Sequence, residues 1–232
     1  SDFVDQMVVG YNKRYNWKTA FASPENVPTF LHAHKLMRKT WEGMPSKEDI
    51  GGDKWNRIAD HCNANYFHID MERYSLEAVL KKGAELVKRK GIKCLVIDPF
   101  NKVRDINAAS DDVNRYTMDY LMKIEIFAKK YDVLVFVVAH PTKMYKNQKT
   151  GEIDEPTMYS IKGGGEWYDA SYHGLLVHRD YEANTVKVKV LKCKFQNLGT
   201  NGAETHFTWE NKSGCYIPLN KPDEEKMPWE NA

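Results

Sequence analysis

The chain has 232 residues, of which 42% are hydrophobic and 28% are charged, and this composition predicts one ordered globular domain rather than a disordered chain. Its 34 Lys and Arg against 32 Asp and Glu leave a net charge of +2, so any nucleic-acid surface must come from local clustering. The four cysteines are widely spaced without a C-x-x-C pair, and no apolar run approaches the roughly 20 residues that cross a bilayer. We therefore expect a cytoplasmic protein without a membrane role or disulfides.

The first two thirds of the chain alternate between helical spacing and short apolar runs. In chain order, we expect a helix at 3–11, a strand at 17–22, a turn at 23–28, a helix to about 39, a helix near 46–62, a strand at 66–69, a helix at 76–90, a strand at 92–97, a helix at 113–128 and a strand at 133–139. The run at 133–139 has no polar alternation, which predicts a strand in the middle of a sheet. Such strands separated by amphipathic helices predict the α/β doubly wound class, with a mainly parallel sheet covered on both faces.

The pattern changes after His140. A polar, lysine-bearing stretch leads to Gly163-Gly164-Gly165, which lacks the Lys-Ser/Thr of a phosphate-binding loop and is interpreted as a hinge. Strand-like segments at 174–178, 185–195 and 205–209, joined by short turns, predict antiparallel additions to the fold. We expect a core at 1–218 and a polar, proline-punctuated, flexible tail at 219–232.

Polar residues follow three of the expected strands, and in an open parallel sheet this edge binds ligands. Asp98 stands where a nucleotide-hydrolysing enzyme holds a carboxylate next to Mg²⁺, and its alternative is a cap or turn residue before Pro99. Glu25 has the alternative of helix capping, with Ser23 as the cap. His140 is either a residue that senses a phosphate or one that hydrogen-bonds locally.

Two lysine clusters stand out. Lys143, Lys146 and Lys149 fit a loop that tracks a nucleic-acid backbone, although a solvated loop explains them equally well. In the strand at 185–195, strict alternation would place Lys192 and Lys194 on the same face as the valines. Since buried unpaired lysines are costly, either a bulge intervenes or the strand leaves the core there, and the ammonium groups can then reach a partner or an anion.

Seven segments occur together in a recognisable order. They are Ser1-Asp2-Phe3-Val4-Asp5-Gln6, Ser23-Pro24-Glu25-Asn26, Leu95-Val96-Ile97-Asp98-Pro99, Val138-Ala139-His140-Pro141-Thr142-Lys143, Ile161-Lys162-Gly163-Gly164-Gly165-Glu166-Trp167, His178-Arg179-Asp180 and Leu191-Lys192-Cys193-Lys194-Phe195. Across nearly the whole chain they resemble the RecA-like ATPase domain of DnaB and Twinkle-type replicative helicases, especially phage and prophage primase-helicases. The resemblance implies a RecA-like P-loop NTPase fold.

The resemblance also implies a function. It implies a ring, usually of six subunits and in some cases seven, that hydrolyses ATP or another NTP with Mg²⁺ at subunit interfaces and moves along single-stranded DNA in the 5′ to 3′ direction, with a primase as a possible partner. Glu25 matches the glutamate that polarises the attacking water, Asp98 the Walker B aspartate, and His140 the phosphate-sensing residue.

Further residues receive roles from the resemblance alone. Lys102, Arg104 and the 143–149 segment match loops that face the DNA channel. Arg179, Lys192 and Lys194 lie where the family places cations that reach a neighbour's γ-phosphate. Lysine cannot form the bidentate fork of arginine, so Arg179 is the alternative finger to Lys194.

Ser1 matches the last residue of the Walker A motif, which implies that Ser1 and Asp98 hold Mg²⁺ directly or through water. The strand and glycine-rich loop that precede this serine in the family are not part of the sequence, and we expect the chain by itself to be inactive as an ATPase. The alternatives are a non-catalytic DNA-binding or ring-assembly module and, less in keeping with the motifs, a recombinase or clock-type ATPase of the RecA fold.

Overall fold

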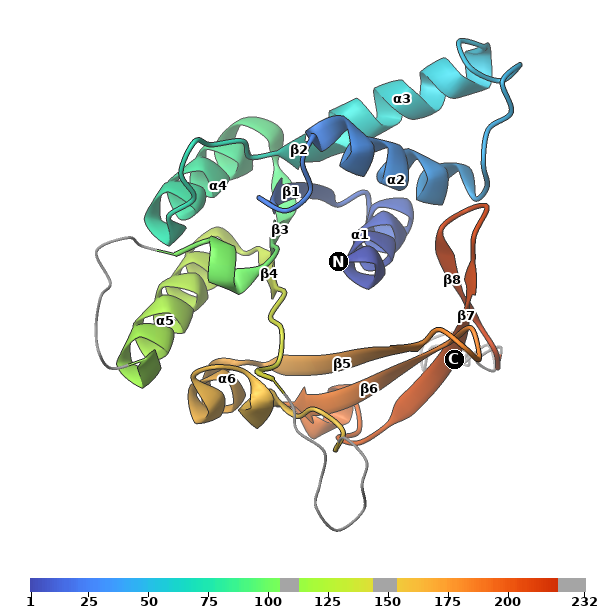
Figure 1. Ribbon diagram of the computed structural model, residues 1–232. Coiled ribbons are helices and arrows are strands. Elements are labelled where there is room, and N and C mark those ends of the chain that lie inside the picture. Colours follow the sequence, from blue (N-terminus) through green and yellow to red (C-terminus); the bar gives the residue numbers. More distant parts are fainter. Residues whose placement is uncertain (105–112, 144–153, 221–232) are drawn as a thin grey trace, which may run out of the picture.

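The structure is a computed structural model that describes residues 1–104, 113–143 and 154–220. The described residues form a parallel and an antiparallel sheet, each of four strands, with helices packed around the parallel one (Figure 1). This arrangement confirms the predicted mixed α/β class with a parallel sheet followed by antiparallel strands.

The parallel sheet has the strand order β2-β1-β3-β4. Its strands are β1 (Lys18–Ala22), β2 (Tyr66–His68), β3 (Ile92–Ile97) and β4 (Leu134–Val137). The helices of this part are α1 (Asp2–Tyr15), α2 (Thr29–Trp41), α3 (Asp53–Asn65), α4 (Leu76–Lys90) and α5 (Val113–Tyr131). All of these elements overlap their predicted ranges.

Both faces of the parallel sheet are covered, as the apolar strands predict. Phe21 and Val96 pack with residues of α1, α2 and α3 on one face. Ala20, Leu95 and Ile97 pack with residues of α4 and α5 on the other. Neighbouring residues of a strand point to opposite faces, so a strand between two helix layers must be apolar throughout.

The position of β4 differs from the prediction. In the described residues it is the edge strand next to β3, not a middle strand, and its four residues are only half-buried. Val135 and Val137 contact one core cluster and Phe136 the other. A continuous apolar run reports that helices cover both faces of a strand, and it carries no information on how many strands flank it.

The antiparallel sheet contains β5 (His173–Asp180), β6 (Thr185–Cys193), β7 (Glu204–Glu210) and β8 (Cys215–Pro218), in that order. Strand β8 was not predicted, because four residues ending in proline give no alternation. Helix α6 (Gly164–Ala170) was not predicted either, since it begins in the glycine-rich segment. Three short 3-10 turns complete the fold: η1 (Phe100–Lys102), η2 (Met158–Ser160) and η3 (Gln196–Leu198).

A β-bulge resolves the position of the lysines in β6. Leu175 pairs with Val190 and Gly174 with Lys192, so Leu191 is an extra residue on β6. Beyond the bulge the buried residue is Cys193, and the exposed one is Lys194. The bulge that the sequence offered as one of two explanations is therefore confirmed.

Helices α1 and α2 join the two sheets. Gln6 of α1 makes two hydrogen bonds with the Tyr216 backbone, donating at 2.7 Å and accepting at 2.5 Å. Arg38 donates to the carbonyls of Asn211 and Lys212, and Lys39 donates to that of Gly214. The N-terminus consequently lies between the parallel sheet and the antiparallel sheet (Figure 1).

Two expectations about the chain's chemistry can be compared with the structure. All four cysteines are free, as predicted. In the part of the chain that the structure describes, no helix combines the length and apolar character that crossing a membrane requires. Residues 221–232 of the predicted tail lie outside the described residues.

Candidate functional site

The residues that follow β1, β3 and β4 meet at one edge of the parallel sheet. The Asp98 amide donates to the Ala22 carbonyl at 3.0 Å, and the Val138 amide donates to the Ile97 carbonyl at 2.9 Å. These bonds continue the strand pairing past the last strand residues. The segments that carry Glu25, Asp98 and His140 therefore leave the sheet side by side, as their positions in the sequence predict.

Asp98 is 4% exposed at the carboxyl end of β3. The following 3-10 turn η1 has Pro99 at its N-cap position and no side-chain cap hydrogen bond, so Asp98 does not cap it. Within the described residues, the Asp98 carboxylate has no hydrogen bond or ion pair. A buried carboxylate without a protein partner is free to accept from water or to ligate a cation.

Glu25 lies in a turn rather than in a helix. The Asn26 amide donates to the Ser23 carbonyl at 3.0 Å, and α2 begins only at Thr29, with Pro28 as its N-cap. The helix-capping explanation of Glu25 is therefore wrong, because no side chain caps α2. Glu25 is exposed, whereas the buried Ser23 hydroxyl has no hydrogen-bond partner among the described residues.

His140 is exposed at the end of β4. Its ring makes no hydrogen bond within the described residues, so the structure gives no support to a purely local role. The backbone beyond it is fixed: Pro141 bridges to Ile161, and the Thr142 amide donates to the Ser160 carbonyl at 2.8 Å. A displacement of His140 would therefore reach the segment that leads into α6.

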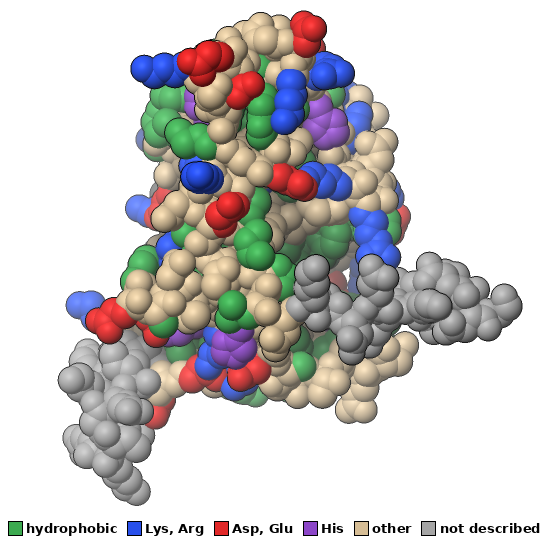
Figure 2. Space-filling view, turned by 90° about the vertical axis from the view of Figure 1, so that its right-hand side faces the viewer, with side chains coloured by type: hydrophobic (Ala, Val, Ile, Leu, Met, Phe, Trp, Pro, Cys, Tyr) green, Lys and Arg blue, Asp and Glu red, His purple; other side chains and the backbone are tan. Residues whose placement is uncertain are grey.

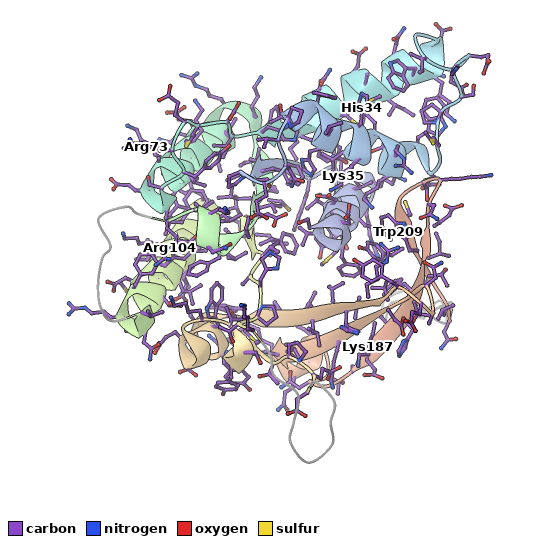
Figure 3. The ribbon with its side chains drawn as sticks, in the orientation of Figure 1. His34, Lys35, Arg73, Arg104, Lys187 and Trp209 are labelled. Carbon is purple, nitrogen blue, oxygen red and sulfur yellow. The ribbon has the colours of Figure 1, made fainter. Side chains whose placement is uncertain are left out.

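Ser1 is the N-cap residue of α1, and it is exposed with no cap hydrogen bond from its side chain. Two acidic residues follow in the first turn, where the helix dipole favours negative charge. Lys35 of α2 lies 3.0 Å from Asp2 and 3.5 Å from Asp5 (Figure 3). Burial alone would lower the pKa of Lys35, but the two carboxylates outweigh it and raise that pKa, so Lys35 stays charged.

The three cations with a predicted phosphate role differ in their surroundings. The Arg179 guanidinium lies over the rings of Tyr181 and Trp209, at 4.7 and 4.9 Å. Lys192 donates to the carbonyls of Tyr168 and Asp169 at the C-terminal end of α6. Lys194 is exposed over the ring of Tyr172, at 4.0 Å. A contact with a neighbouring subunit involves a second chain, so the finger role of these residues stays a prediction.

The predicted DNA-facing residues are described only in part. Lys102, Arg104 and Lys143 are exposed, and Arg104 lies over the Tyr116 ring at 5.0 Å (Figure 3). Lys146 and Lys149 lie outside the described residues. On the face in Figure 2 basic and acidic side chains are mixed, in keeping with the small net charge.

Sequence reasoning missed a buried network of Asp5, His32 and His68. The two histidines were set aside because they lack metal spacing, and the described residues contain no group of three or more His, Cys, Asp or Glu that could hold a metal. A signal existed in α1, where Asp5 shares the buried stripe with Val8, Val9 and Asn12. A carboxylate on an apolar helix face requires a partner.

The fold and this edge define a class: the RecA-like ATPase domains of DnaB-like helicases. A solved ATPase domain of this class superposes with a TM-score of 0.71, covering 95% of this chain and 82% of that one at 14% identity. A DnaB-like replicative helicase, solved in a study of its interactions with primase, gives a TM-score of 0.72 over 95% of this chain and 54% of that one, also at 14% identity. At this identity the likeness establishes the fold.

The sequence itself has a curated relative, the chloroplastic/mitochondrial Twinkle homolog protein of Arabidopsis thaliana, which is 27% identical over 237 residues. The match covers 93% of this chain and 32% of the relative, so the chain spans about a third of that protein. No family model matches the chain. The resemblance to DnaB and Twinkle-type replicative helicases is thus confirmed in both sequence and fold.

Proposed function

We propose that this chain is the motor domain of a ring-forming replicative DNA helicase, which hydrolyses ATP or another NTP with Mg²⁺ and moves along single-stranded DNA in the 5′ to 3′ direction. The observation that carries the proposal is the convergence of Glu25, Asp98 and His140 at the carboxyl edge of a sheet with the DnaB-like fold. Ligands bind at this edge in open parallel sheets.

The side chains at this edge fit a magnesium nucleotide. Mg²⁺ prefers oxygen ligands and commonly takes one or two carboxylates together with phosphate oxygens and water. Asp98 supplies a buried carboxylate with no protein partner in the described residues, and Ser1 supplies an exposed hydroxyl. In this assignment these two residues hold the ion, which neutralises charge on the phosphates.

The three residues then have separate tasks. Glu25, exposed in its turn, accepts a proton from the water that attacks the γ-phosphate. His140 contacts the phosphate and transmits its loss through Pro141 and the Pro141–Ile161 bridge. Arg179, Lys192 or Lys194 stabilises charge on a neighbour's nucleotide, and Arg179 is the only one of the three with a guanidinium fork.

The decisive experiment is an ATPase assay of residues 1–232 beside a version with a strand and a Gly-x-x-x-x-Gly-Lys loop added before Ser1, each with and without single-stranded DNA. We expect turnover only in the extended version, stimulated by DNA, because backbone amides and a lysine are needed to hold the phosphates. Absence of turnover in both versions would instead favour a non-catalytic DNA-binding or ring-assembly module.

The catalytic role of Glu25 has its own test in the extended protein. We expect Glu25→Gln to lower kcat by roughly 10²- to 10⁴-fold while ATP still binds, because the amide cannot accept the proton. Glu72→Gln is the matched control, since Glu72 is also an exposed loop glutamate but lies away from this edge, after β2 and before α4. Unchanged turnover in Glu25→Gln would remove this role.

The DNA-facing assignment is tested by salt titration of single-stranded DNA binding. Replacing Lys143, Lys146 and Lys149 together with alanine is expected to weaken binding and to reduce the salt slope by about 0.7 per lost phosphate contact. Replacing Lys81, Lys88 and Lys90 of α4 with alanine removes the same charge elsewhere and serves as the control. Equal effects of the two triple variants would contradict a specific DNA loop.

The remaining assignments concern the complete protein. We propose a ring of six or seven copies in the cytoplasm, with a primase as partner. The support is the similarity to DnaB-like helicases, one of which was studied in its interactions with primase. Light scattering in the presence of MgATP, with and without a primase, measures both the ring size and the partnership.

A further inference from the structure

Asp5, His32 and His68 form a buried chain of hydrogen bonds across three elements. Asp5 Oδ1 lies 3.0 Å from His32 Nε2, and His32 Nδ1 lies 2.8 Å from His68 Nε2. Asp5 and His32 are 2% and 1% exposed, whereas His68 is half-buried. The chain links the first turn of α1 to α2 and to the last residue of β2.

These side chains enclose the strand that leads to Glu25. Phe21 of β1 lies edge-on to the His32 ring at 4.7 Å and parallel to the His68 ring at 5.7 Å. Phe21 also pairs with His68 in the sheet, and its carbonyl accepts from the Ile69 amide at 2.8 Å. The last buried residues of β1 are therefore held by both histidines.

The Glu25 turn spans residues 23–28 and is fixed from both ends by the same network. At its start, Phe21 lies between the two imidazole rings. At its end, α2 begins at Thr29, and its first turn carries His32, which is bonded to Asp5. Because the segment is short, the position of each end limits where the Glu25 carboxylate can lie.

We propose that Asp5, His32 and His68 are a positioning relay that holds the Glu25 turn against α1 and so sets the alignment of Glu25 for water activation. The relay deepens the proposed function and rests on it. Asp5, His32 and His68 do not touch the nucleotide in this assignment, so they act through Glu25 and not as catalytic residues.

Hydrogen-bond chemistry orders the protons in the relay. An ionised Asp5 can only accept, so His32 Nε2 donates to it. A single proton then lies between His32 Nδ1 and His68 Nε2. The charged groups around the relay are Asp2 of α1, Lys35 and Lys39 of α2, and Asp70 after β2. Replacing His68 breaks the outer bond without removing a charge from the buried centre.

The test compares two replacements of His68 in the extended, ATP-hydrolysing protein. His68→Phe keeps a ring against Phe21 but loses the hydrogen bond, and we expect kcat to fall by roughly ten- to a hundred-fold with the KM for ATP nearly unchanged. His68→Gln retains an amide that bonds His32 Nδ1, and it is expected to restore most of kcat. The control is His34→Phe, since His34 is an exposed histidine on the same helix as His32 (Figure 3).

A second measurement uses residues 1–232 and needs no turnover. Hydrogen exchange at the Asn26 amide, which closes the Glu25 turn, is expected to accelerate in His68→Phe but not in His68→Gln, while the Asp98 amide exchanges as in the wild type. Wild-type kcat in His68→Phe, an effect on KM alone, or unchanged exchange at Asn26 would overturn the relay. Wild-type turnover in Glu25→Gln would instead overturn the proposed role of Glu25, whereas the exchange result still decides whether the relay holds the turn.

Discussion

At the scale of single residues, the main feature is a histidine that is kept neutral inside the fold. Burial and the neighbouring His32 lower the pKa of His68 to about 4, against the opposing effect of Asp5 and Asp70. The partner carboxylate behaves differently. Burial by itself raises the pKa of Asp5, but the hydrogen bond and charge of His32 and the charge of Lys35 outweigh it and lower that pKa.

The shifted pKa of His68 predicts a pH-dependent stability. Between pH 6.5 and about 4 the unfolded chain binds a proton at His68 that the folded chain does not, so the free energy of unfolding falls as the pH falls. Because His68 is only half-buried, solvent screening limits the loss to about 1–2 kcal/mol. Urea unfolding across this range should show a flatter profile for His68→Gln, and an equally steep profile would contradict the prediction.

At the scale of elements, the packing of α6 on α5 depends on one glycine. Gly163 precedes α6 with φ +92°, and a Cβ built there would lie 2.3 Å from Thr117 Oγ1 of α5. The close approach explains why a glycine-rich segment, interpreted from sequence as a hinge, ends against a helix. Whether it also acts as a hinge stays a prediction.

We expect Gly163→Ala to lower the free energy of unfolding by about 2–4 kcal/mol, because the new methyl group adds a clash to an unfavourable backbone conformation. Gly165→Ala is the matched control, since a Cβ there meets nothing within 4 Å and Gly165 has no left-handed φ. That control should be neutral or slightly stabilising because alanine favours a helix over glycine. Equal chemical denaturation midpoints for the two variants would refute the steric explanation.

At the scale of the whole molecule, the two sheets are held together by contacts of α1 and α2 with the β7–β8 hairpin. Lys39 is 3% exposed, donates to the Gly214 carbonyl, and lies 5.1 Å from the Trp209 ring and 5.5 Å from the Tyr216 ring. Burial lowers the pKa of this lysine despite nearby carboxylates. Trp209 points from β7 toward α1, so the contact lies close to the N-terminal end of that helix (Figure 3).

Replacing Lys39 with methionine keeps the apolar stem but leaves the Gly214 carbonyl without its donor. We expect a loss of about 1–3 kcal/mol in the free energy of unfolding. Hydrogen exchange should accelerate in β8 and leave β3 unchanged, because the antiparallel sheet loosens first. Lys47→Met serves as the control at an exposed position. Uniformly faster exchange in both sheets would show that Lys39 supports the core rather than the junction.

The sequence by itself determined most elements of the parallel sheet and the edge at which Glu25, Asp98 and His140 meet. Helical spacing and apolar runs are local consequences of burying one helix face or both strand faces, so they can be read without knowing the partners. Parallel strands separated by helices then place their carboxyl ends together. The bulge in β6 was also detectable, because a lysine on a valine face violates a local rule.

Only the tertiary structure decided the edge position of β4, the short β8, helix α6, and the bonding of Asp5 to His32 and His68. Each depends on which distant segments come together, and residues that are 27 and 36 positions apart carry no local pattern of their contact. The same holds for Lys192, whose donation to the end of α6 is invisible in its own strand. Periodicity records that a side chain is buried, whereas the long-range fold determines what it is buried against.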